Sequence, residues 1–136
     1  MYRYIHSPDD PRRGGKVESD QNYPGTHEGQ LSSWVLFGPD RVYADYRLGN
    51  FGTERLAVSV DTYAPGGSTE PHAHDDREQG YYVIAGRAEI TIGDETRQVG
   101  PGASGYMPPG LMHAFRNVGD EPLSVAVISA YLGDPP

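Results

Sequence analysis

Short runs of alternating or continuous apolar residues, separated by glycine and proline, follow one another along most of the chain. Residues 56–63 and 87–92 alternate apolar and polar side chains, which is the pattern of a half-buried β-strand. Residues 123–131 are almost entirely apolar or small, and they predict a strand that is covered on both faces. By the same criteria we expect further strands at 31–37, 42–48, 81–84, 96–99 and 113–118.

Turn residues end most of these runs. Gly38-Pro39 and Pro65-Gly66-Gly67 are expected to stop two strands, and Gly93-Asp94 predicts a tight hairpin turn because glycine accepts a positive φ. No segment has the pattern of an amphipathic helix. The chain is therefore predicted to be all-β, either a sandwich or a barrel over residues 31–136, with residues 1–30 as an N-terminal arm.

Composition narrows the possible functions. A chain of 136 residues fits one domain, and the lack of cysteine excludes disulfides and thiolate metal sites. The net charge of -8 argues against nucleic acid as a partner, since a phosphate-binding surface needs the opposite sign. We expect a cytoplasmic protein without membrane contact, because no apolar stretch is long enough for a signal peptide or a membrane span.

Histidine placement is the most informative chemical feature. If His72-Ala73-His74 is extended, both imidazoles lie on one face, and imidazole is a common ligand for transition metals. Gln79 shares the strand parity of Tyr81, so its amide oxygen could face these rings, whereas Glu78 would face the other way. His113 opens a later strand after a Pro-Pro-Gly turn.

Two gapped motifs in this region resemble those of the cupin superfamily. The first is carried by Gly66, His72, His74, Gln79 and Gly86, and the second by Gly102, Pro108, Gly110, His113 and Asn117. The resemblance implies a double-stranded β-helix, or jelly-roll barrel, with one divalent metal ion held by His72, His74, His113 and a fourth ligand. Cupins most often have Glu at the fourth position. Strict spacing gives Gln79 here, and Glu78 is the alternative if a β-bulge shifts the strand parity.

The expected ligands are all neutral, so a bound ion would keep its full charge and act as a stronger Lewis acid. Nitrogen-rich sites suit Zn, Fe, Ni or Cu, of which we favour Zn or Fe. His27 could add a ligand if the arm folds over the barrel mouth, although a surface loop histidine is the favoured interpretation, as it is for His6.

Aromatic and basic residues supply further candidates. Tyr81 is the candidate catalytic residue, because its parity points it into the cavity, where a phenol could donate to a substrate. Other tyrosines are expected to be core aromatics, namely Tyr63, Tyr82 and Tyr106. Two arginines could pair with an anionic substrate or could simply be exposed, namely Arg87 and Arg97.

We therefore expect a metal-dependent cupin that acts on a small oxygenated molecule as an isomerase, cyclase, lyase or oxygenase. The alternative is a non-catalytic module that binds or senses a sugar or organic acid, and a purely structural metal ranks last. A homodimer is expected, as in cupins of this length. Trp34 and Phe37 of the apolar strand 31–37 would be a hazard on a free edge, and a partner would cover them.

Overall fold

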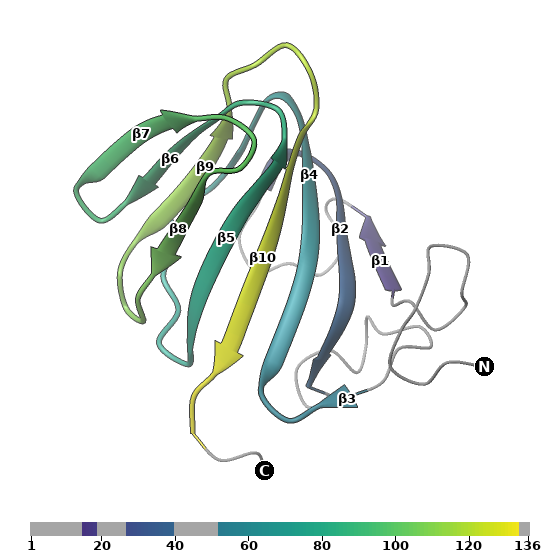
Figure 1. Ribbon diagram of the computed structural model, residues 1–136, viewed down its shortest axis with the longest axis vertical. Coiled ribbons are helices and arrows are strands. Elements are labelled where there is room, and N and C mark those ends of the chain that lie inside the picture. Colours follow the sequence, from purple (N-terminus) through teal and green to yellow (C-terminus); the bar gives the residue numbers. More distant parts are fainter. Residues whose placement is uncertain (1–14, 19–26, 40–51, 134–136) are drawn as a thin grey trace.

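The computed structural model describes residues 15–18, 27–39 and 52–133, which consist of β-strands joined by turns (Figure 1). Within these ranges, no helix has the length and apolar character needed to cross a membrane. In chain order the strands are β1 (Gly15–Glu18), β2 (His27–Pro39), β3 (Gly52–Thr53), β4 (Leu56–Thr69), β5 (Arg77–Ala85), β6 (Ala88–Ile92), β7 (Glu95–Val99), β8 (Ser104–Met107), β9 (His113–Asn117) and β10 (Leu123–Tyr131).

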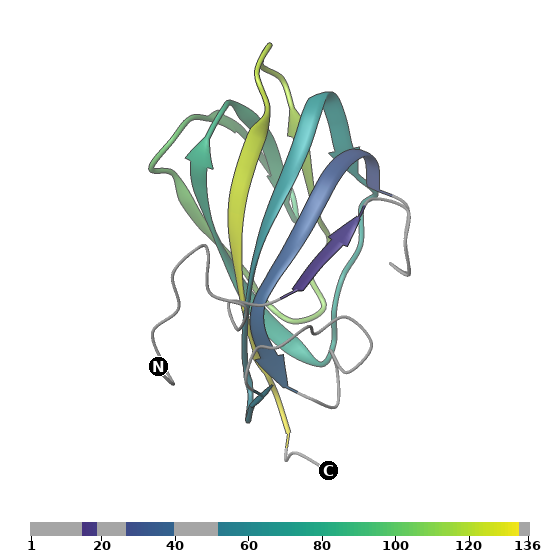
Figure 2. The same ribbon diagram turned by 90° about the vertical axis from the view of Figure 1, so that its right-hand side faces the viewer.

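The strands form one curled sheet in the order β7-β6-β9-β4-β10-β5-β8, to which β2 adds through β4. All pairs are antiparallel except that between β2 and β3. Seen from the side, β1, β2, the first part of β4 and β10 lie next to one another (Figure 2). This curled antiparallel half-barrel confirms the predicted all-β, jelly-roll class of fold.

Strand β4 is longer than the sequence indicates, and it carries the curl. The predicted stop at Pro65-Gly66-Gly67 is wrong, because the strand continues to Thr69. Its first part pairs with β10, and beyond the Pro-Gly-Gly segment Ser68 pairs with Arg116 of β9. The glycines therefore bend the strand from one half of the sheet to the other rather than ending it.

Apolar side chains from both halves meet inside the curl. The core consists of Tyr63, Tyr81, Val83, Ala88, Ile90, Met107, Phe115, Leu123 and Val125. Removing a side chain such as Val83 or Leu123 from water contributes about 1.5–3 kcal/mol, so this cluster is the main source of stability.

One end of the curl is fixed by polar and backbone contacts. Buried Asn117 donates to the carbonyl oxygens of Tyr63 and Glu121 at 3.1 and 2.8 Å and accepts from the amide of Gly119 at 2.9 Å. Nearby, Gly86 has φ 90°, and an added Cβ would lie 2.7 Å from the Pro122 carbonyl oxygen. Any other residue there would be strained and would push these turns apart.

Three expectations about burial are wrong. Tyr82 and Tyr106 are 49% and 55% exposed, since they lie on the outer faces of β5 and β8 rather than in the core. Strand β10 is covered on one face only, because Ile128 is 37% exposed. Tyr63, at 2% exposure, does belong to the core as predicted.

The predicted strand 31–37 is part of β2, but β2 is not a free edge. It pairs with β4 on one side and with β1 on the other, where Trp34 lies opposite Lys16. The edge argument for a dimer is therefore wrong, and the homodimer itself stays a prediction. The predicted strand 42–48 lies outside the described residues.

A carboxylate lies on the inner side of β4. The alternation places Asp61 on the same face as buried Ala57 and Tyr63, which is the reverse of what the valines of this strand suggest. Ser33 of β2 donates to the Asp61 carboxylate at 2.7 Å. Burial raises the pKa of Asp61 to about 6, and hydrogen bonds from Ser33 and Ser59 oppose this rise only in part.

This raised pKa predicts a specific pH dependence of stability. A carboxyl group whose pKa is higher in the folded state stabilises the fold when protonated, and this contribution is lost as the pH rises from about 4 to about 6. Asp61→Asn keeps an acceptor for Ser33 and removes the charge. We expect it to raise the free energy of unfolding by roughly 1 kcal/mol above that range and by little below it.

The measurement is denaturant unfolding of the variant and the parent across this pH range. Asp120→Asn, in an exposed turn, is the matched control and is expected to show no such pH-dependent difference. A constant difference between Asp61→Asn and the parent at every pH would contradict the role given to Asp61.

Candidate metal centre

Three histidines from two distant segments lie together at the end of the curl opposite to Asn117. One ring nitrogen from each of His72, His74 and His113 lies within 4.8 Å of the other two. The ring centroids of His72 and His113 are 4.4 Å apart. The ring centroid of His74 is 5.0 Å from that of His72 and 5.6 Å from that of His113. Nitrogens bound at about 2.1 Å to one tetrahedral ion are about 3.4 Å apart, so this cluster could hold a metal ion once the three rings move closer together.

The backbone positions His72 against His113. Each amide donates to the other residue's carbonyl, at 3.1 and 2.9 Å, so the two residues form an isolated antiparallel bridge. The Nδ1 atom of His72 lies 2.6 Å from the carbonyl oxygen of Glu70. The Nδ1 atom of His113 lies 3.2 Å from the carbonyl oxygen of Leu111. Protons on both Nδ1 atoms satisfy these carbonyls and leave both Nε2 atoms as acceptors, the form in which imidazole binds a metal.

The electrostatics of the cluster favour the uncharged rings. Burial lowers the pKa of His74 to about 4, and the positive charge of Arg77 adds to this effect. Burial also lowers the pKa of His113, with a further contribution from His72. At neutral pH, His74 and His113 are therefore in the form that a metal ion requires.

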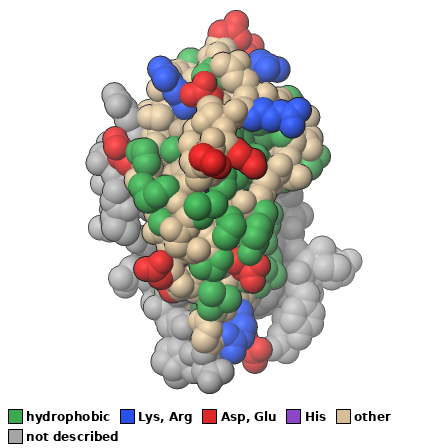
Figure 3. Space-filling model, turned by 90° about the vertical axis from the view of Figure 1, so that its left-hand side faces the viewer, with side chains coloured by type: hydrophobic (Ala, Val, Ile, Leu, Met, Phe, Trp, Pro, Cys, Tyr) green, Lys and Arg blue, Asp and Glu red, His purple; other side chains and the backbone are tan. Residues whose placement is uncertain are grey.

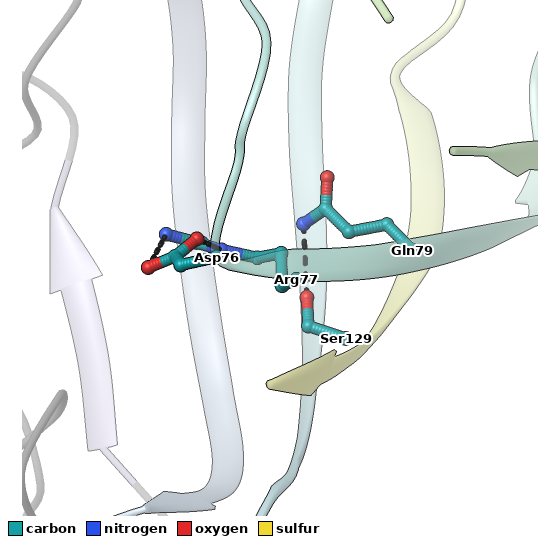
Figure 4. A network of polar contacts seen from close by, with 4 residues as sticks. All are labelled: Asp76, Arg77, Gln79 and Ser129. Atoms are coloured by element: carbon teal, nitrogen blue, oxygen red, sulfur yellow. Dashed lines mark hydrogen bonds and ion pairs between the residues drawn. The ribbon is translucent and has the colours of Figure 1, made fainter. Parts of the chain in front are cut away.

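Gln79 lies on β5 with its side chain held by β10. It is 9% exposed, and its Nε2 donates to Ser129 Oγ at 2.9 Å. In Figure 4 the amide nitrogen faces Ser129 and the amide oxygen points away from it. Ser129 thus fixes which end of the amide is available as an acceptor. Gln79 as the fourth ligand stays a prediction.

Glu78 and His27, the two other candidate ligands, are placed differently. Glu78 accepts a hydrogen bond from the exposed Tyr106 hydroxyl at 3.2 Å, so it lies on the outer side of β5, as strand parity predicts. It is not a member of the cluster found among the described histidines and acids. The backbone of His27 pairs with Thr69, three residues before His72, and its side chain lies outside the described part of the chain.

A cation lies close to the cluster. Arg77 donates through Nε to Asp76 at 2.8 Å (Figure 4). Its guanidinium carbon is 4.6 Å from the centre of the Tyr131 ring. The hydrogen bond from Arg77 lowers the pKa of Asp76. Arg77 is therefore tethered beside the histidines, where its charge disfavours imidazolium.

The sequence did not identify Ser129 or Arg77 as part of this region. Ser129 is fifty residues from Gln79 along the chain, and only strand pairing brings them together. A signal did exist, since Ser129 has the inward parity of an otherwise apolar strand. Tyr81 does lie inside the curl, as predicted, with its ring 5.4 Å from that of Phe115.

Comparison with known sequences points to one family. Residues 59–129 match the cupin domain family, and this range includes all three clustered histidines. An uncharacterised protein of Streptomyces coelicolor is 41% identical over 75 residues, which cover 52% of this chain and 68% of that protein. The mannose-1-phosphate guanylyltransferase ManC of Salmonella typhimurium is 35% identical over 110 residues, which cover 81% of this chain but only 21% of that enzyme.

Solved structures agree with this match. A Thermus thermophilus protein is 27% identical with a TM-score of 0.56, covering 60% of this chain and 77% of that one. A chain from structures of DMSP lyases is 26% identical with a TM-score of 0.60, covering 73% of this chain and 46% of that one. A Thermotoga maritima protein described as a predicted oxalate decarboxylase shares the fold. It is 15% identical with a TM-score of 0.63, covering 94% of this chain and 100% of that one. With its match over residues 59–129 of 136, the chain belongs to the cupin family.

Proposed function

We propose that this cupin is a metal-dependent enzyme that acts on a small oxygenated molecule. The observation that carries the proposal is the cluster of His72, His74 and His113, with two Nδ1 atoms on backbone carbonyls. A divalent ion bound there would act as a Lewis acid and polarise a carbonyl or carboxylate oxygen. Imidazole ligands suit Zn, Fe, Ni or Cu, and we favour Zn or Fe.

The chain's own residues have distinct tasks in this proposal. The three histidines hold the ion, and Gln79, oriented by Ser129, offers a neutral oxygen as the fourth ligand. Neutral ligands leave the site with its full positive charge, which favours an oxygen-rich or anionic substrate. The likeness to a chain from DMSP lyase structures supports a reaction on a small molecule of this kind.

The first test is metal content. We expect the protein, after incubation with Zn²⁺ or Fe²⁺ and removal of excess, to retain about one equivalent by elemental analysis. His72→Ala and His113→Ala are each expected to retain less than roughly a tenth of an equivalent, because two imidazoles alone bind weakly. His6→Ala is the matched histidine control. If the parent protein retains no Zn, Fe, Ni or Cu, or if both cluster variants retain the full amount, the proposal fails.

A second test addresses the fourth ligand. Gln79→Glu adds a negative charge beside the ion, so we expect affinity for Zn²⁺ to rise roughly tenfold and Gln79→Ala to lower it by a similar factor. Competition with a chromophoric chelator measures both. Glu78→Gln is the control and the test of the alternative ligand, since it alters an outward carboxylate. Loss of affinity in Glu78→Gln with no change in Gln79→Ala would reverse the assignment.

A third test separates positioning from ligation. Ser129→Ala removes the acceptor of the Gln79 amide, and we expect Zn²⁺ affinity to fall roughly tenfold while the fold is retained. Ser124→Ala, on the outer side of the same strand, where its hydroxyl meets Thr62 at 3.2 Å, is the control. In Gln79→Ala the effect of Ser129→Ala is expected to vanish. Equal effects in both backgrounds would show that Ser129 does not act through Gln79.

A further inference from the structure

The two end strands of the curled sheet, β7 and β8, leave an open cavity between them. The cavity has a volume of about 970 Å³ and lies apart from the histidines, none of which lines it. Its apolar lining includes Ile90, Ile92 and Val99, all on the inner face of the β6–β7 hairpin. Figure 3 shows this side of the molecule, where hydrophobic side chains cover the middle with acidic side chains among them, and most basic side chains lie toward the upper end.

Arg97 lies on the inner face of β7, an end strand of the sheet, and its side chain is exposed. The register pairs Arg97 with Ile90, and directly opposed residues of an antiparallel pair share one face. Ile90 belongs to the core, so Arg97 points to the same side as the core and lines the cavity. Among the residues that the structure describes, no carboxylate forms an ion pair with Arg97.

Other charges divide the cavity into two ends. The acids Asp94 and Glu95 lie at the hairpin turn. Arg87 lies at the opposite end of β7, where its Nη1 is 3.4 Å from the position of a Cβ on Gly100. The same register places Glu95, opposite Ile92, on the inner face two residues from Arg97, so the cavity has an acid next to Arg97 and a second basic residue, Arg87, farther along.

Tyr81 adds a hydroxyl group to the same cavity. Its ring lies against the backbone of Gly105 in β8, where an added Cβ would lie 2.1 Å from Cε1 and 2.6 Å from the hydroxyl oxygen. Only glycine leaves room for the ring in this position. Burial raises the pKa of Tyr81, and the positive charge of Arg97 opposes this rise. The phenol is therefore protonated at neutral pH and can donate a hydrogen bond, and Arg97 is near enough to affect it electrostatically.

We propose that this cavity binds the carboxylate of a small organic acid, with Arg97 as its charged partner and the Tyr81 hydroxyl as a second donor. A planar guanidinium binds a carboxylate through two parallel hydrogen bonds, and the apolar lining fits the rest of an organic anion. The proposal goes beyond the proposed function, because none of the clustered histidines lines the cavity, and it describes a binding site separate from the metal centre. The Tyr81–Phe115 contact joins the cavity to the strand that begins with His113.

The probes are benzoate and its neutral analogue benzamide, at constant ionic strength. Titration followed by amide chemical shifts, with zinc-loaded and with metal-free protein, gives each dissociation constant. We expect benzoate to bind at β7 and β8 and benzamide to bind at least roughly fivefold more weakly. Arg97→Gln is expected to weaken benzoate roughly fivefold or more and Tyr81→Phe roughly threefold, with benzamide unaffected by Arg97→Gln.

Arg116→Gln is the matched control, because it makes the same change of charge on the outer side of β9. Unchanged benzoate binding in Arg97→Gln, or an equal loss in Arg116→Gln, would overturn the proposal. So would equal binding of benzoate and benzamide. Because the metal-free protein is titrated as well, failure of the metal proposal would leave this result intact, and failure here would leave the metal content unchanged.

Discussion

The bend of β4 is the constraint on which the rest of the structure depends. Its first part lies between β2 and β10, and its last residues keep β2 on one side but meet β9 in place of β10 on the other. A strand that changes partners in this way delivers the following residues to the start of β9, where His72 and His113 exchange backbone hydrogen bonds. The two halves of the histidine cluster therefore meet because of backbone pairing, before any side chain is considered.

Five of the ten fixed positions of the two sequence motifs fall into two physical classes. His72, His74 and His113 form the cluster that could bind a metal. Gly86 and Asn117 lie at the other end of the curl, where one allows close backbone contact and the other satisfies turn carbonyls. The motifs thus contain residues needed for the fold as well as residues of the site, because the strands that end at these turns begin near the histidines.

Local patterns predicted much of the fold, and long-range pairing decided the rest. The hairpin of residues 88–99 and the bounds of β10 follow from alternation and from turn residues. Pro65-Gly66-Gly67 has the composition of a stop, but pairing on both sides carries β4 through it. The histidines were found because their types and spacing are chemically distinctive. The pairing of Ser129 with Gln79 and that of Arg97 with Ile90 depend on strand register, which the sequence does not display.

The open side of the curled sheet has a consequence for how copies of the protein meet. Both β7 and β8 lack a second neighbour among the described strands, so their outer backbone groups could pair with a strand of another molecule. Strand β7 is protected by its composition, because Glu95, Thr96, Arg97 and Gln98 are all exposed and polar. Three of these residues, Glu95, Arg97 and Gln98, also line the cavity, so the side chains that border it discourage the pairing of β7 with a strand of a second chain.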